Sequence, residues 1–190
     1  NDAVRANSTV SQNQAVNDLI IDSGFTVIVD SGQTLSVSGN LTNNAEVTGA
    51  GEVILNGTSA QSISGTGDFE NLRINNPSSV TIDNPVDTPL NLSGVLYVDQ
   101  GTLNTAGNLY LRCNFDSPPK TAQVAAVNGV ITGNVTVEQC YPARRAFRLV
   151  SSSVTGGTIQ SNWQEGINNT GLNFPTDNQN PNTGFGTHIT

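Results

Sequence analysis

The carboxylates of this chain are the residues whose type and spacing could do chemistry. A glycoside hydrolase needs two carboxyl groups about 5 to 10 Å apart across a groove. Three pairs have a suitable spacing: Asp22 with Asp30, Asp83 with Asp87, and Asp99 with Asp116. All but Asp116 stand close to Gly, Pro or Asn at expected corners, where Asp is favoured by its turn chemistry. We therefore interpret these carboxylates as turn residues and predict that the chain is not an enzyme.

The only histidine, His188, gives no better site. No second His, free thiolate or carboxylate cluster stands near it in the sequence. Nucleophilic and acid–base sites need several such groups together. We interpret His188 as a structural residue, and we assign no catalytic, cofactor-binding or metal-ligating residue.

Calcium is the cofactor that the sequence leaves open. Asp22-Ser23-Gly24 and Asp30-Ser31-Gly32 are alike, and stacked Asp side chains and backbone carbonyls could form an oxygen cage. The full Gly-Gly-x-Gly-x-Asp repeat of calcium-binding β-rolls is absent. Plain turns are the simpler interpretation of both triplets.

The only cysteines, Cys113 and Cys140, are 27 residues apart. In a solenoid with about 20 to 27 residues per coil, this separation places them on neighbouring coils. It does not match the closely set ligand pairs of a zinc site. We predict a structural disulfide, of the kind that exported proteins keep, with two free buried thiols as the alternative.

Three of the seven basic residues lie together at Arg144, Arg145 and Arg148. Guanidinium groups bind carboxylates and anionic glycans through paired hydrogen bonds. Because the chain has a net charge of −8, we expect these arginines to pair with Asp and Glu where one module meets the next.

The composition excludes several classes of partner. A net charge of −8 repels duplex nucleic acid and anionic membranes, and aromatic residues, at 5%, offer few stacking platforms. No apolar span is long enough for membrane insertion. The chain begins with Asn1 rather than Met, and we interpret it as a mature or excised piece of a larger exported polypeptide.

The elements that must position these residues are short strands. Most have three to five residues, are rich in β-branched side chains, and are bounded by Gly, Asn, Asp or Ser. We expect strands at 19–21, 26–29, 34–37, 46–48, 52–55, 62–64, 71–74, 80–82, 95–98, 109–111, 123–127, 130–132 and 135–137.

Two all-β folds fit such strands. A Gly-Asn pair followed by an apolar residue returns at Gly39, Gly107 and Gly133, and this repetition favours a parallel β-helix, a solenoid. Asn56-Gly57 is a hairpin candidate that favours the alternative, an antiparallel β-sandwich. We predict the solenoid, with Asp-Ser-Gly turns at coil corners and asparagines hydrogen-bonding to their copies above and below.

The pattern divides the chain into three parts. Residues 1–17 lack a clear strand pattern and are predicted to be a lead-in segment. Residues 18–140 are the solenoid, with about six coils. Residues 141–190 hold the arginine cluster, the only Trp and a Pro/Asn-rich run, and we expect a boundary segment and the loop-rich, truncated start of another module.

Several segments resemble a known family. Asn56 to Gly67 and Phe69 to Asn76 are similar to the β-helical repeats of large surface proteins from Bacteroidetes. Arg144 to Leu149, Trp163 to Gly166 and Gly186 to Thr190 are similar to segments that follow such repeats. The resemblance implies a cell-surface or filament protein exported by the type IX secretion system, of the class that includes gliding-motility adhesins. The C-terminal sorting domain of that family is not in this sequence.

The sequence therefore predicts a structural and adhesive extracellular protein. Its β-solenoid is a rigid spacer of a larger secreted adhesin and performs no catalysis. The expected partners are neighbouring repeats or modules of the same or identical chains, the secretion machinery that the resemblance implies, and surface glycans. The alternative is a carbohydrate-binding or carbohydrate-active β-helix.

Overall fold

The chain folds as an all-β parallel solenoid. The computed structural model describes residues 2–85, 88–114, 120–125 and 127–140, and these contain strands and turns but no helix. Every strand pairing within them is parallel except the one between β16 and β17, which excludes the antiparallel sandwich. The described part of the chain accordingly has no helix that could cross a membrane.

Twenty strands form the described part of the chain. In order they are β1 (Asp2–Val4), β2 (Ser8–Val10), β3 (Gln14–Val16), β4 (Leu19–Ile21), β5 (Thr26–Val29), β6 (Thr34–Val37), β7 (Leu41–Asn43), β8 (Glu46–Thr48), β9 (Glu52–Leu55), β10 (Gln61–Ser64), β11 (Asp68–Phe69), β12 (Leu72–Ile82), β13 (Leu90–Leu92), β14 (Val95–Asn104), β15 (Leu109–Leu111), β16 (Cys113–Asn114), β17 (Lys120–Thr121), β18 (Gln123–Val124), β19 (Val130–Thr132) and β20 (Val135–Val137).

The strands stack into three faces, each visited once per coil. The first face holds β1, β4, β7, β10, the second half of β12, the second half of β14, and β19. The second face is a seven-stranded sheet of β2, β5, β8, β11, β13, β15 and β20. The third holds β3, β6, β9, the first halves of β12 and β14, and β18.

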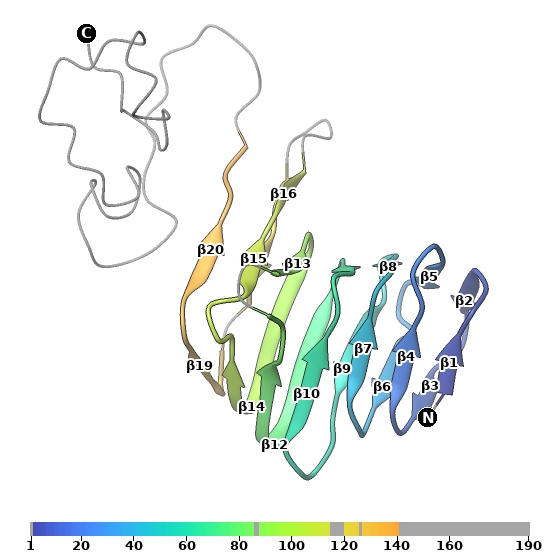
Figure 1. The fold of residues 1–190 in the computed structure, drawn as a ribbon, viewed down its shortest axis with the longest axis horizontal. Coiled ribbons are helices and arrows are strands. Elements are labelled where there is room, and N and C mark those ends of the chain that lie inside the picture. Colours follow the sequence, from blue (N-terminus) through green and yellow to red (C-terminus); the bar gives the residue numbers. More distant parts are fainter. Residues whose placement is uncertain (1, 86–87, 115–119, 126, 141–190) are drawn as a thin grey trace, which may run out of the picture. The chain divides into compact units, whose positions relative to one another are not determined.

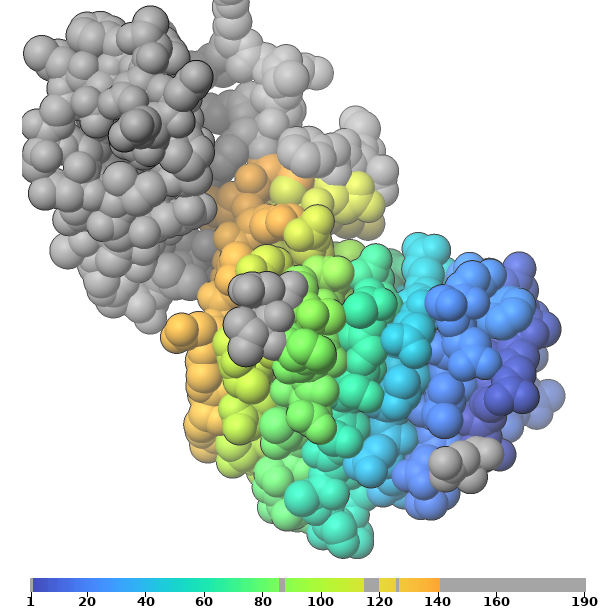
Figure 2. All heavy atoms as spheres, in the orientation of Figure 1, coloured from blue at the N-terminus to red at the C-terminus, as the bar shows by residue number. Residues whose placement is uncertain are grey.

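Figure 1 shows successive coils side by side along one axis, and Figure 2 shows the same order as successive bands of colour. Each coil therefore contacts mainly the coils before and after it. The long strands β12 and β14 bend through a corner and so join the first and third faces into one eleven-stranded sheet.

One apolar core runs down the middle of the coils. Along most strands, buried and outward side chains alternate, because successive Cβ atoms of a strand point to opposite faces. Register then places buried residues of successive coils over one another, as with Leu19, Leu41 and Ile63 on the first face. Fully burying one such side chain contributes roughly 1.5 to 3 kcal/mol.

The corners depend on glycine and on asparagine. Gly24 and Gly32 have φ values of +84° and +74°, so both predicted Asp-Ser-Gly triplets turn the chain with a left-handed Gly. At Gly65, with φ +103°, an added Cβ would collide with the Asn43 carbonyl of the coil before. Coils pack here backbone against backbone, which leaves no room for a side chain.

Corner side chains bind the next coil, but through its backbone. We expected asparagines to bond to their own copies. Instead, their carbonyl oxygens accept backbone N–H groups one coil further on. These bonds run from Thr26 N to Asn7 Oδ1 (3.0 Å), Thr34 N to Asn13 Oδ1 (3.0 Å), Ser62 N to Asn40 Oδ1 (2.9 Å) and Val95 N to Asn71 Oδ1 (3.0 Å), and Asp18 Oδ1 likewise accepts Asn40 N (2.7 Å). Each bond supplies a partner to an amide at or beside the start of a strand, where the ladder has not yet begun.

The structure differs from the sequence prediction at two further points. Residues 2–16 are not a lead-in segment, because β1, β2 and β3 pair in parallel with β4, β5 and β6 and so form the first coil. Asn56-Gly57 is not a hairpin, because β9 pairs with β6 and β12 rather than with β10. There the Gly57 amide donates to the buried Gln61 Oε1 at 2.8 Å, inside a corner.

Replacing Ile63 by Ala tests the apolar column. Ile63 is fully buried on β10, and we expect its truncation to lower the free energy of unfolding by about 2 to 5 kcal/mol, because the stacked neighbours cannot close the cavity. Ile28→Ala is the matched control, since Ile28 is 41% exposed, and it should cost less than about 1 kcal/mol. Urea unfolding followed by circular dichroism measures both, and equal losses would contradict the assignment of the core.

Candidate functional site

The two cysteines that the sequence paired are bonded in the structure. Cys113 on β16 and Cys140, three residues after β20, form a disulfide with their Cα atoms 5.7 Å apart. The bond links the last two strands of the second face, because β15 leads into Cys113 and β20 leads into Cys140. Cys113 also begins a hairpin of β16 and β17, the antiparallel pair of the described residues.

An ion pair lies beside the disulfide. Arg112 Nη1 contacts Glu138 Oε1 at 2.7 Å, and the Cys113 amide donates to Glu138 Oε2 at 3.3 Å. The Glu138 amide donates to the Leu111 carbonyl at 2.9 Å, so the ladder continues past β20 to the bridge. We call Arg112, Cys113, Glu138 and Cys140 the staple, because they hold the segment after β20 to the segment after β15.

A second polar cluster lies on the outward side of the third face. Arg73 on β12 bonds to Glu52 on β9 (Nε to Oε1, 2.9 Å) and to Asp99 on β14 (Nη1 to Oδ2, 2.6 Å). Its guanidinium carbon also lies 4.0 Å from the ring centroid of Tyr97 on β14. The hydrogen bond to Glu52 raises the pKa of Arg73 above its ordinary value, and partial burial opposes it more weakly. Arg73 thus ties three successive strands together.

The carboxylate pairs suggested by spacing do not form a shared site among the described residues. Asp22 binds Arg5 at 3.0 Å, Asp30 is exposed at a corner, and Asp99 is paired with Arg73. Asp83 is described, but its suggested partner Asp87 and the partner of Asp99, Asp116, lie outside the described residues. Where the structure describes the chain, no three His, Cys, Asp or Glu residues come together as a metal site.

Register brings together two carboxylates that spacing did not suggest. Glu46 on β8 and Asp68 on β11 are direct neighbours on the outward side of the second face. Asp68 accepts a hydrogen bond from Asn91 Nδ2 at 2.8 Å. The signal in the sequence was only a separation of about one coil, which many other polar pairs share.

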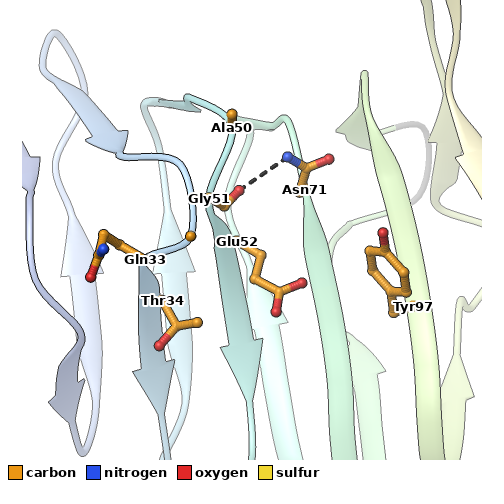
Figure 3. Close-up of a pocket in the computed structure, with 8 residues that line it drawn as sticks. Gln33, Thr34, Ala50, Gly51, Glu52, Asn71 and Tyr97 are labelled. Carbon is orange, nitrogen blue, oxygen red and sulfur yellow. Dashed lines mark hydrogen bonds between the residues drawn. The ribbon is translucent and has the colours of Figure 1, made fainter.

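A shallow groove lies beside Arg73 on the third face, and Figure 3 shows its lining. Its volume is about 310 Å³. Glu52 points from β9 toward the ring of Tyr97, and Asn71 fixes the corner above them by donating to the Gly51 carbonyl at 3.0 Å. The groove is lined by Gly32, Gln33, Thr34, Ala50, Gly51, Glu52, Asn71 and Tyr97.

The remaining residues singled out in the sequence are outside the described part. Arg144, Arg145 and Arg148, proposed as interface or anion contacts, and His188 all fall within residues 141–190. Their roles stay predictions. The compact unit that contains the solenoid runs from Asn1 to Pro142.

Comparison with known proteins does not assign the chain to a family. No model of a protein family, no characterised protein and no solved structure matches the chain.

Replacing both cysteines by Ser tests the staple. In the chain-entropy description, closing a loop of this length stabilises the folded state by about 3 to 4 kcal/mol. We expect the double variant Cys113→Ser/Cys140→Ser to open first at β15 and β20, with faster amide hydrogen exchange there. Exchange in β4 and β7 should not change, because coils interact mainly with their neighbours. Uniformly faster exchange along the chain would contradict a local role.

Replacing Arg73 by Met tests the polar cluster. The change leaves Glu52 and Asp99 without their shared partner, and we expect a loss of about 1 to 3 kcal/mol in the free energy of unfolding. Arg5→Met removes an ion pair in which the Arg5 side chain is 76% exposed, so it should cost under about 1 kcal/mol. Because the pKa of Arg73 is raised, its contribution is complete below its ordinary pKa and is lost only at more alkaline pH.

Urea unfolding of both arginine variants at neutral pH and at pH about 9 makes the comparison. The difference between Arg73→Met and Arg5→Met should be the same at the two pH values. Equal stability of the two variants would show that the cluster contributes nothing beyond an exposed pair.

Proposed function

We propose that this chain is a stiff structural unit of a larger exported surface protein, where it acts as a spacer with an adhesive outer surface. The observation that carries the proposal is the continuous solenoid: parallel ladders link every coil to the next, from β1 to β20, around one apolar core. Such a body resists bending and local opening, since moving any coil breaks the ladders on both of its sides.

The staple supports a location outside the cytoplasm. Structural disulfides form and persist in oxidising compartments, and the Cys113–Cys140 bond joins the segments that follow β15 and β20. The resemblance to large Bacteroidetes surface proteins agrees with export to the cell surface and with type IX secretion. It also agrees with a place in adhesion or gliding filaments.

The outward residues support a role without catalysis. Asp22 and Asp99, two of the carboxylates that spacing suggested, are bound to Arg5 and Arg73, and the core is apolar. A spacer needs only length, rigidity and a soluble surface, and the outward Thr, Ser, Asn and charged side chains provide the last of these. The alternative function, glycan binding, is favoured by one observation, the groove that contains Tyr97.

Deleting one coil tests the spacer. Leu41 and Ile63 are aligned, and Thr42 bonds to Ser64, 22 positions later. Removing residues 42–63 therefore joins equivalent positions of two coils, and we expect a folded, shorter solenoid. Removing only residues 42–52 is the matched control. It should prevent folding, because it moves apolar side chains out of the core.

Far-UV circular dichroism and resistance to protease report the fold of both deletions. In the parent protein on intact cells, antibody labelling should find the one-coil deletion outside the envelope, as for the natural chain. Equal loss of fold in the two deletions would contradict the modular spacer. Labelling only after cells are permeabilised would contradict the surface location.

A further inference from the structure

We propose that the groove on the third face binds a short, linear, uncharged glycan. It would be the adhesive contact of the spacer, and in that respect the inference rests on the function proposed above. The groove lies on the outward side of β6, β9 and β14, next to the corner at Asn71.

The dimensions of the groove favour a ligand that lies along the solenoid axis. From Thr34 on β6 to Tyr97 on β14 the groove crosses three strand spacings, which is about 14 Å. Its volume of about 310 Å³ is at the small end of ligand sites. A trough that is long but small holds a few sugar rings in line and excludes a branched or bulky ligand.

The polar groups in the groove suit hydroxyl groups. Within the described residues, no hydrogen-bond partner is found for the side-chain amide of Gln33, the Thr34 hydroxyl or the Tyr97 hydroxyl, whereas the backbone amides of Gln33 and Thr34 are bonded to Asp30 and Asn13. Glu52 uses Oε1 to bind Arg73, and among the described residues no partner is found for Glu52 Oε2. Together they offer donors and acceptors on both sides of the trough, which is what a sugar with alternating hydroxyls requires.

The site is already ordered before a ligand binds. Arg73 lies over the Tyr97 ring and holds Glu52, while Asn71 accepts from Val95 N at 3.0 Å and donates to the Gly51 carbonyl at 3.0 Å. A ligand then does not have to order these side chains, which removes part of the entropic cost of binding.

Charge selects against ionic ligands. The carboxylates of Glu52 and Asp99 face the single guanidinium of Arg73, and the whole chain has a net charge of −8, so an anionic glycan is repelled. A metal cation would meet only Glu52 beside a guanidinium, and where the chain is described no group of three acidic, His or Cys ligands exists. A neutral polyhydroxyl ligand avoids both penalties.

Saturation-transfer NMR on the full chain tests the inference. The probes are cellotriose, maltotriose, mannotriose and the trimer of N-acetylglucosamine, with trigalacturonate as the anionic probe. We expect transfer to at least one neutral trimer and none to trigalacturonate. Thr34→Val and Tyr97→Phe each remove one hydroxyl and keep the side-chain shape, so each should weaken binding about fivefold. Tyr97→Phe also keeps the ring that Arg73 covers.

Tyr110→Phe is the matched control, because Tyr110 is a half-buried tyrosine on β15 of the second face, outside the groove. The affinity of this variant for the neutral trimer should equal that of the natural chain. Three outcomes would overturn the inference. They are no transfer to any neutral trimer, equal binding by Tyr97→Phe and Tyr110→Phe, and transfer to trigalacturonate alone. None of these outcomes would contradict the proposed spacer function if the one-coil deletion still folds and reaches the surface. The two proposals can therefore fail separately.

Discussion

The parallel backbone ladder between coils is the interaction on which the rest of this structure depends. Each strand donates to and accepts from the strand one coil before and one coil after, and buried backbone groups must find such partners. The ladder fixes the register, and the register stacks Leu19, Leu41 and Ile63 into one column. A shift of a single residue would turn every apolar side chain outward, so the core and the ladder each require the other.

The corners show how a chain of about 20 residues per coil keeps this register while coil length varies. Left-handed glycines turn the chain, and close contacts such as that at Gly65 let the coils approach backbone to backbone. Asparagines then bind the first amides of the next coil, as Asn40 does for Ser62. The corners therefore absorb differences in length, and the faces between them stay regular.

The outward positions are free of these constraints, and the side chains that could bind a ligand or form ion pairs lie there. Arg73 binds carboxylates from the coils on both sides, and Tyr97 lies against it at the edge of the groove. Beyond β15 and β20, a disulfide between Cys113 and Cys140 and an ion pair between Arg112 and Glu138 add to the ladder. A regular interior thus supports an irregular, polar exterior, which is the arrangement expected of a scaffold that carries contact sites.

The sequence by itself determined the all-β parallel solenoid, most of its strands, the Asp-Ser-Gly corners and the pairing of Cys113 with Cys140, because alternation, turn chemistry and coil spacing are local or periodic signals. It did not reveal the first coil, where each strand of residues 2–16 buries at most one apolar side chain, such as Val10. Only the tertiary structure decided which outward side chains meet. Glu52, Arg73 and Asp99 are separated by 21 and 26 residues, and polar outward positions carry no period that would align them. Their contacts follow from the exact length of each corner, and that length is set by how whole coils pack.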